Sequence, residues 1–213
     1  MKIKILFLNF IILLIATVGH AQPSSSLISN NIHPRYNYDL SGSYPSIKGE
    51  KFKEVNNSIL KFITGNFDKK GEVYPTEISF NKLFENKYIL SFSLDYNISN
   101  ATERYFNKYY TLSLIDKKEL SLAEYLEANN ISKYDVLNSI NNVIGLCLSS
   151  RKSLPDYCSD MTLQSLIENN TKVDYSDISG FFIKKNSIGI GIDSNKFTTT
   201  FIYNIKTKKT FIK

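Results

Sequence analysis

The pattern that most restricts the fold of this chain is a two-residue alternation over residues 88–99. Apolar or aromatic side chains stand at every even position of this segment, namely Tyr88, Leu90, Phe92, Leu94, Tyr96 and Ile98. Apart from Ile89, the odd positions carry serine, aspartate or asparagine. Because successive side chains of a strand point to opposite faces, this pattern predicts one long strand with a buried face and a wet face. Such a strand is typical of an antiparallel sheet that is covered on one side.

Two amphipathic helices are predicted to cover that sheet. Between residues 49 and 66, apolar side chains recur every three or four positions, at Phe52, Val55, Ile59, Phe62 and Ile63. A second stripe follows the capping serine Ser132, at Val136, Ile140, Val143 or Ile144, and Cys147. Both stripes have the 3.6-residue period of a helix with one apolar side.

The two faces of the long strand should therefore differ in burial. We expect Leu90, Phe92 and Leu94 to lie beneath the helix of residues 52–63 or the helix of residues 136–147. Ser91 and Ser93, on the opposite face, are expected to be more exposed.

The order of the patterns sets the fold class. Further strands are expected around residues 78–80, 109–115, 181–183, 188–192, 197–205 and 210–212. The order of strand, helix, strands, helices, strands has no regular βαβ alternation, which favours an α+β fold with a largely antiparallel sheet and helices packed on one face. Residues 36–213 are predicted to form a single domain, whose two halves could meet near residues 100–105.

The beginning of the chain has the pattern of a secretory signal peptide. Two lysines precede an apolar run from Ile5 to Val18, and a small-residue cleavage site ends at Ala21. We therefore expect residues 1–21 to be removed and residues 22–35, rich in serine, asparagine and proline, to form a flexible leader. The product should be periplasmic or secreted, without a stable membrane anchor after cleavage.

Cys147 and Cys158 are the two cysteines of the chain. In an exported protein an even number of cysteines favours a disulfide. A redox-active pair is the alternative, but it usually has a Cys-x-x-Cys spacing, which is absent. We expect the two cysteines to form a structural disulfide.

Few residues are suited to catalysis. After cleavage His33 is the remaining histidine, so no histidine pair is left for a metal cluster or a Ser-His arrangement. Gly189-Ile190-Gly191 lacks the third glycine and the helix of a phosphate loop, and it indicates a strand packed closely by its backbone. No spacing selects a carboxylate pair or a calcium loop. The sequence predicts no catalytic residue, no metal site and no cofactor, with a carboxylate-based hydrolase as the last-ranked alternative.

The segment from Asn100 to Tyr110 carries four aromatic residues and one arginine between two predicted strands. Tyrosine and arginine are enriched in binding hot spots, and loops on a rigid scaffold often carry recognition. A possible partner-binding surface therefore comprises Arg104, Tyr105, Phe106 and Tyr109. The alternative is that two or three of these rings turn inward as strand residues.

Several segments together resemble a known family. They are Tyr44-Pro45 before a helix with Asn56-Asn57, the strand from Tyr88 to Tyr96, Tyr110–Leu114, the turn Asp116–Glu119, Leu120–Leu126, and Phe181–Ile188. This arrangement resembles the exported domain-of-unknown-function family found in the extracellular part of the lysozyme-sensing anti-sigma factor and in some peptidoglycan deacetylases. Where that family often has a Gly-Gly-Ala-His loop, this chain has Ser99–Thr102. The resemblance implies a non-catalytic module associated with the bacterial envelope.

The charge of the chain does not decide its function. The formal net charge is +6, and the lysines are scattered in pairs at expected turns, so a nucleic-acid stripe is not predicted. The function expected is an exported, non-catalytic binding module that acts on a protein or a peptidoglycan-related partner. The alternative is a periplasmic immunity or inhibitor protein that neutralises a toxin or a cell-wall hydrolase.

Overall fold

The computed structural model describes residues 27–71, 74–149 and 153–213. Its first half is a six-stranded sheet with one long helix, and its elements are β1 (Leu27–Asn31), β2 (Leu40–Ile47), η1 (Glu50–Phe52), α2 (Lys53–Phe67), β3 (Thr76–Glu85), β4 (Ile89–Ser99), β5 (Glu103–Ser113) and β6 (Lys118–Glu119). The strands lie in sequence order. β2 and β3 form the one parallel pair within the described residues.

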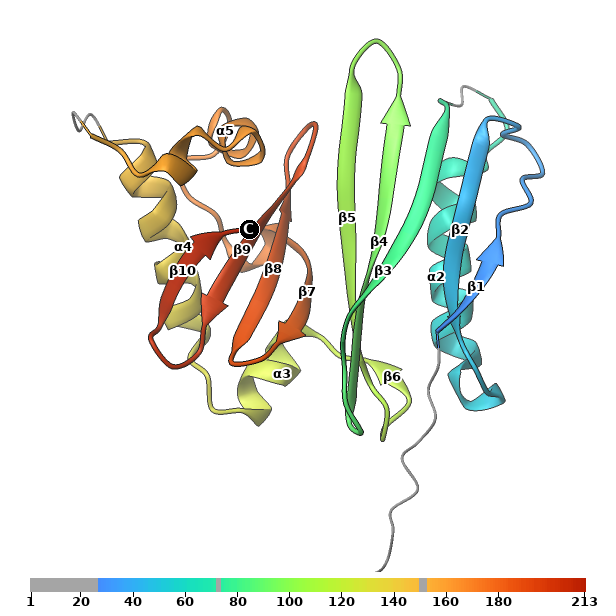
Figure 1. Ribbon diagram of the computed structural model, residues 1–213, viewed down its shortest axis with the longest axis horizontal. Helices are drawn as coiled ribbons and strands as arrows, with labels where there is room; N and C mark the ends of the chain where they lie inside the picture. The colour runs from blue at the N-terminus through green and yellow to red at the C-terminus, as the bar shows by residue number, and fades with distance from the viewer. Residues whose placement is uncertain (1–26, 72–73, 150–152) are drawn as a thin grey trace, which may run out of the picture.

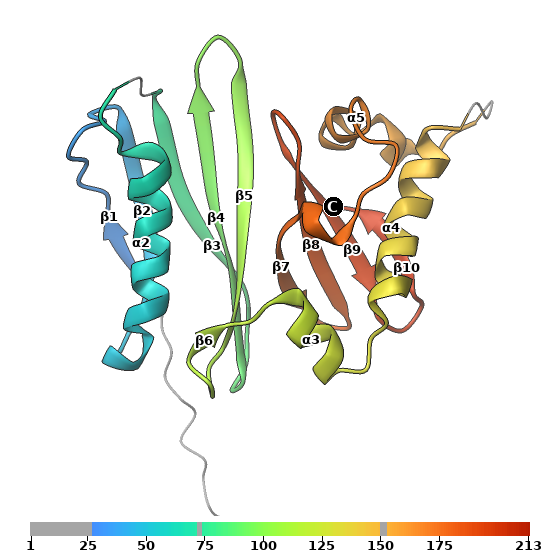
Figure 2. The ribbon, with the colours of Figure 1, turned by 180° about the vertical axis from the view of Figure 1, so that it is seen from behind.

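The second half is a four-stranded antiparallel sheet with helices on one side. Its elements are α3 (Leu122–Ala128), α4 (Lys133–Cys147), η2 (Asp156–Ser159), α5 (Met161–Ile167), η3 (Tyr175–Asp177), β7 (Ile178–Lys184), β8 (Ser187–Asp193), β9 (Thr198–Asn204) and β10 (Lys209–Ile212). The two sheets lie between α2 on one side and α3, α4 and α5 on the other (Figures 1 and 2). The α+β prediction with mostly antiparallel strands is confirmed, and the strands are divided between two sheets.

The first apolar core lies between α2 and the sheet. Val55, Ile59 and Ile63 recur along α2 and are buried. They belong to the same buried cluster as Leu90, Phe92 and Leu94 of β4, and each of these three β4 residues is 0% exposed. The expected burial of this face of β4 beneath the first helix is confirmed.

The opposite face of β4 is also buried, contrary to expectation. Ser91 is 0% exposed and Ser93 is 3% exposed, because the second sheet covers them. Ser91 Oγ lies 3.0 Å from Thr111 Oγ1 and accepts a hydrogen bond from the Ile183 backbone N–H at 3.1 Å. Ser91 is therefore buried with hydrogen-bond partners, Ser93 is buried beside it, and the prediction that the two serines are more exposed is wrong.

The two sheets approach closely where β7 crosses β5. A Cβ added to Gly180 would lie 2.6 Å from the backbone oxygen of Tyr109, so this contact requires glycine. The glycines of β8 also leave room for a close contact, and the groups that fill this room are aromatic rings. A Cβ on Gly189 would meet the Phe182 ring, and one on Gly191 would meet the Tyr109 ring. The close packing predicted for β8 is present, and in β8 it involves rings rather than a second backbone.

The second apolar core lies between the β7–β10 sheet and the helices. Isoleucines of β8 and residues Phe201 and Tyr203 of β9 pack in one buried cluster with α3, α4 and α5. Cys147, at the end of α4, forms a disulfide with Cys158, and their Cα atoms are 5.2 Å apart. The predicted disulfide is confirmed.

Ordered structure begins earlier than the sequence predicted. Residues 27–31 form β1, which pairs antiparallel with β2, so the flexible leader predicted over 22–35 is wrong for its described part. The chain passes from the first half to the second between β6 and α3, at residues 120–121, rather than near residues 100–105. The predicted signal peptide, residues 1–21, lies outside the described residues. Within them, no helix is both long enough and apolar enough to span a bilayer.

Candidate binding surface at the end of β5

A hollow of about 280 Å³ lies on the face of β3–β5 that turns toward the second sheet. The side chains of this face that line it come from three neighbouring strands and are Glu77, Ser79, Asp95, Asn97, Tyr105 and Asn107. The strand alternation explains this set, because odd-numbered residues of β4 and β5 share one face. Near the β4–β5 hairpin this face is therefore polar and partly exposed, whereas toward Ser91 it is buried.

A carboxylate held by two amides organises the floor of the hollow. Asn81 Nδ2 donates to Asp95 Oδ2 at 2.6 Å, and Asn107 Nδ2 donates to Asp95 Oδ1 at 2.7 Å. The side-chain oxygen of Asn97 is buried and has no hydrogen-bond partner. The floor thus has a fixed carboxylate and, beside it, a buried acceptor oxygen that has no donor.

The two halves of the molecule also meet at this hollow. The Tyr105 backbone N–H donates to the Lys196 oxygen at 2.8 Å, and Tyr105 forms a bridge with Phe197. Their rings are parallel within 3°, with centroids 6.4 Å apart, and Tyr105 is 46% exposed. The Tyr105 hydroxyl donates to the Glu103 carboxylate, and this hydrogen bond raises the pKa of Tyr105. An aromatic pair from both halves therefore stands beside acidic side chains.

A second carboxylate lies at the end of β8. Asp193 accepts hydrogen bonds from Thr198 Oγ1 at 2.6 Å and from Ser179 Oγ at 3.1 Å. The protein atoms packed around its carboxyl group raise the pKa of Asp193, although these two hydroxyls act in the opposite direction. Asp193 thus adds to the acidic character of this end of the interface.

The four residues predicted as a partner surface do not form one surface. Tyr105 is exposed on the face that carries the hollow, and Tyr109 is on the same face but buried, with its hydroxyl 2.7 Å from Thr200 Oγ1. Arg104 and Phe106 project from the other face, where Phe106 stacks on Tyr96 with ring centroids 5.3 Å apart. One of the adjacent rings Tyr105 and Phe106 is thus exposed, as the strand alternation requires, and the structure brings Tyr105 together with residues that the prediction did not include.

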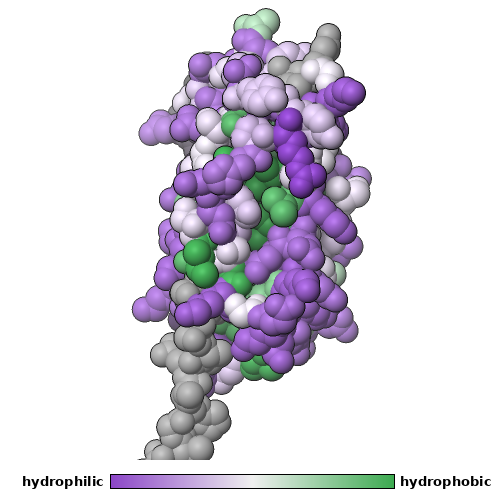
Figure 3. All heavy atoms as spheres, turned by 90° about the vertical axis from the view of Figure 1, so that its right-hand side faces the viewer, coloured by the Kyte–Doolittle hydropathy of each residue, from purple (hydrophilic) through white to green (hydrophobic). Residues whose placement is uncertain are grey.

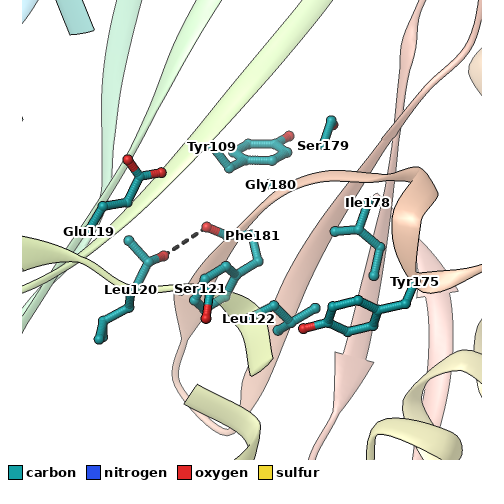
Figure 4. A pocket seen from close by; sticks show the side chains of 11 residues that line it. Tyr109, Glu119, Leu120, Ser121, Leu122, Tyr175, Ile178, Ser179, Gly180 and Phe181 are labelled. Carbon is teal, nitrogen blue, oxygen red and sulfur yellow. Dashed lines mark hydrogen bonds between the residues drawn. The ribbon is translucent and has the colours of Figure 1, made fainter. Parts of the chain in front are cut away.

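A second hollow, of about 230 Å³, lies where the chain passes from β6 to α3 (Figure 4). Thr111 Oγ1 donates to the Phe181 oxygen at 2.7 Å across it, which is the dashed line in Figure 4. The Tyr175 hydroxyl is buried without a hydrogen-bond partner and points toward Leu122. Because its walls are the same residues that join the two sheets, we assign this hollow to the interface between the halves.

In the described part of the chain, no three His, Cys, Asp or Glu side chains lie close enough together to bind one metal ion.

The residues missed by sequence reasoning are Asp95, Asn97 and Asn107 of the floor, and Phe197. The alternation over residues 88–99 could have placed Asp95 and Asn97 on one face. Phe197 could not be found in this way, because its contact with Tyr105 joins strands far apart in the sequence.

Comparisons with known proteins give distant structural neighbours alone. No family model matches the chain, and no curated protein matches it. A solved member of the DUF3298 family from Bacteroides fragilis has 12% identity and a TM-score of 0.39, covering 79% of this chain and 81% of that one. A DUF3298 family protein from Pseudomonas aeruginosa has 6% identity and a TM-score of 0.39, covering 81% and 83%. Both are described as members of a domain-of-unknown-function family, and at these values they assign no function to this chain.

Proposed function

We propose that this chain is an exported, non-catalytic binding module that contacts a protein partner of the bacterial envelope through the end of β5. The observation that carries the proposal is the half-exposed ring of Tyr105, which lies parallel to Phe197 at the junction of the two sheets. Tyrosine offers a large contact area at a small entropic cost, because its side chain has few rotatable bonds. Here its position is fixed further by the backbone bond to Lys196.

The chemistry of the hollow beside Tyr105 indicates a basic group on the partner. Glu77, Asp95 and Glu103 place carboxylates around it, and the buried Asn97 oxygen lacks a donor. A lysine or arginine side chain of the partner would supply donors to these carboxylates and could rest against an aromatic face. The hollow is thus an acidic surface on a chain whose net charge is +6.

The disulfide between Cys147 and Cys158 supports an oxidising compartment, since such bonds persist there. The resemblance to an exported family associated with anti-sigma factors and peptidoglycan deacetylases is in keeping with an envelope role. We place the partner in that compartment for these two reasons.

The test is site-specific photo-crosslinking in cells that export the chain. A photoreactive residue at position 105 should capture a defined envelope protein, whereas the same residue at Tyr134, which is 72% exposed on α4, should not. With the captured protein purified, Tyr105→Ala should weaken binding by about tenfold, equivalent to 1.4 kcal/mol, while the unfolding midpoint stays unchanged. Equal capture at both positions would contradict the proposal, and retention on purified peptidoglycan without a protein adduct would identify a cell-wall partner instead.

The alternative function, an inhibitor of a toxin or a cell-wall hydrolase, is favoured by the same acidic hollow. Enzymes that act on anionic polymers concentrate positive charge around their active sites, and this charge complements the hollow. If the captured protein is such an enzyme, the chain should lower its activity at stoichiometric concentration, and Tyr105→Ala should restore that activity. A captured enzyme whose activity does not change would leave the binding module as the function and exclude inhibition.

A further inference from the structure

A second surface, on the side of the molecule opposite the α4 layer, lies between β1 and α2. Two hollows of about 120 and 370 Å³ follow one another along it. Ile28 of β1 is 42% exposed and Leu60 of α2 is 41% exposed, and both line these hollows. Tyr44 of β2 lines the smaller hollow, and Ile47 of β2 lines the larger one. Figure 3 shows this side, with apolar groups gathered along the middle and hydrophilic side chains around them.

The outer edge of β1 has backbone groups that no strand takes up within the described residues. β1 is the last strand on its side of the sheet. The Ile32 N–H donates to the Gly42 oxygen at 3.1 Å, and antiparallel alternation then places Ile28 and Asn30 among the residues bonded to β2. The N–H and C=O groups of Ser29 and Asn31 accordingly point outward from the sheet.

β1 also lacks the usual protection of an edge strand. Its sequence, Leu-Ile-Ser-Asn-Asn, contains no charged residue and no proline. Natural edge strands commonly carry lysine, proline or a bulge to prevent pairing with another chain. An edge without such protection, next to a groove in which Ile28 and Leu60 are exposed, is suited to the addition of an extended segment.

The charges at the two ends of the groove select among extended segments. Lys48 lines one end, where the neighbouring Glu50 is paired with Lys53 at 3.1 Å. At the other end Asp68 lines the hollow, is buried and accepts hydrogen bonds from three backbone N–H groups, and the positive charge of the exposed Arg35 acts on this carboxylate. The charge left to meet a ligand is therefore that of Lys48, and it complements an acidic residue at one end of an apolar segment.

We infer that the β1–α2 groove binds an extended peptide segment of a partner protein, added as a strand to the edge of β1. Apolar side chains at alternate positions of that segment contact Ile28 and Leu60, and an acidic residue at one end approaches Lys48. This surface is separate from the Tyr105 surface and does not depend on the function proposed for it.

The test uses the full exported chain and a labelled octapeptide of alternating valine and threonine with glutamate at both ends. Fluorescence anisotropy should show saturable binding at peptide concentrations below about 1 mM, in the range of a weak complex. The same peptide with N-methyl groups on alternate backbone amides keeps its side chains but cannot pair with β1, so its binding should be lost. Equal binding of both peptides, or binding of neither, would overturn the inference.

Matched variants locate the peptide. Ser29→Pro removes an outward N–H without removing a β1–β2 hydrogen bond, and it should weaken binding about tenfold, whereas Ser29→Ala should bind like the wild type. Leu60→Glu should also weaken binding, whereas Leu148→Glu, at a leucine that is 43% exposed in the other half, should not. Unchanged binding by Ser29→Pro would show that the peptide lies elsewhere.

Two other occupants give different results. If the chain is a dimer in solution and Ser29→Pro makes it a monomer, the edge is occupied by a second copy. If the peptide binds only after residues 22–26 are removed from the exported chain, the chain's own leader occupies the groove. Either result would replace the partner peptide and overturn the inference.

Discussion

The two faces of β4 and β5 are both buried over residues 90–93 and 109–112, but they are held by different contacts. On the α2 side, Phe92 and Tyr110 stack with ring centroids 5.1 Å apart, and the surrounding contacts are apolar. On the other side, Ser91, Thr111 and Tyr109 meet the second sheet through hydroxyl groups. The first face gains stability because apolar surface area is removed from water, and this hydrophobic contribution depends little on the direction of the contacts. The second face depends on matched donors and acceptors, and these fix how one sheet sits on the other.

The largest effect is expected on the apolar face. Phe92→Ala should lower the free energy of unfolding by roughly 3–5 kcal/mol, because the ring is 0% exposed and its removal leaves a cavity. Denaturant unfolding followed by circular dichroism measures this loss. A loss below about 1 kcal/mol would mean that apolar burial is not what stabilises the α2 side of β4 and β5.

Removal of the disulfide tests whether the core beneath α3, α4 and α5 unfolds independently of the core beneath α2. Replacing both Cys147 and Cys158 by alanine should cost about 3 kcal/mol, since the bond closes a short loop at the end of α4. Hydrogen exchange should show the loss concentrated in α4 and α5, and the amides of β4 should stay protected. Uniform loss of protection would indicate that the two cores unfold as one unit.

The apolar face was predictable from the sequence because its period is local. The alternation of residues 88–99 and the stripe of α2 each lie within one segment, and together they placed Leu90, Phe92 and Leu94 in the core. The same alternation predicted that Ser91 and Ser93 are exposed to solvent, because serine in a strand usually faces solvent. The second sheet that covers Ser91 and Ser93 is formed by residues about 90 positions later in the sequence. A pattern within one segment cannot predict contact with residues so far away. The same reason separates Tyr105, which was part of the predicted partner surface, from Phe197, which was missed.

The close approach of β7 to β5 at Gly180 allows the contact between the two sheets to be tested with one added carbon atom. Gly180→Ala should destabilise the protein by about 2–3 kcal/mol, because the new Cβ meets the Tyr109 backbone oxygen and neither strand can move without breaking its ladder. Gly145→Ala is the matched control. No atom lies within 4 Å of its added Cβ, and within α4 alanine should stabilise by up to about 1 kcal/mol. Thermal unfolding of the two variants should therefore shift in opposite directions.

The smallest stability effect is expected from the hydroxyl contacts. Thr111→Val keeps the shape of the side chain but removes the donor to the Phe181 oxygen, and it should cost about 1–2 kcal/mol. Ser91 loses a partner in the same variant, so the double variant with Ser91→Ala should cost less than the sum of the two single variants. Additive losses in this double-mutant cycle would show that the two hydroxyls act independently.

The hydroxyl contacts between the sheets also bear on the order in which the protein folds. Tyr109 meets Thr200 and Asn107 meets Thr198 across 91 positions of sequence, whereas β4 and β5 are joined by a short hairpin. Contacts of such wide separation form late, because the intervening chain must be ordered before they can close. Each sheet should therefore assemble with its own helices first, and docking of the two halves should complete folding. Thr198→Val should accordingly speed unfolding while leaving the folding rate nearly unchanged.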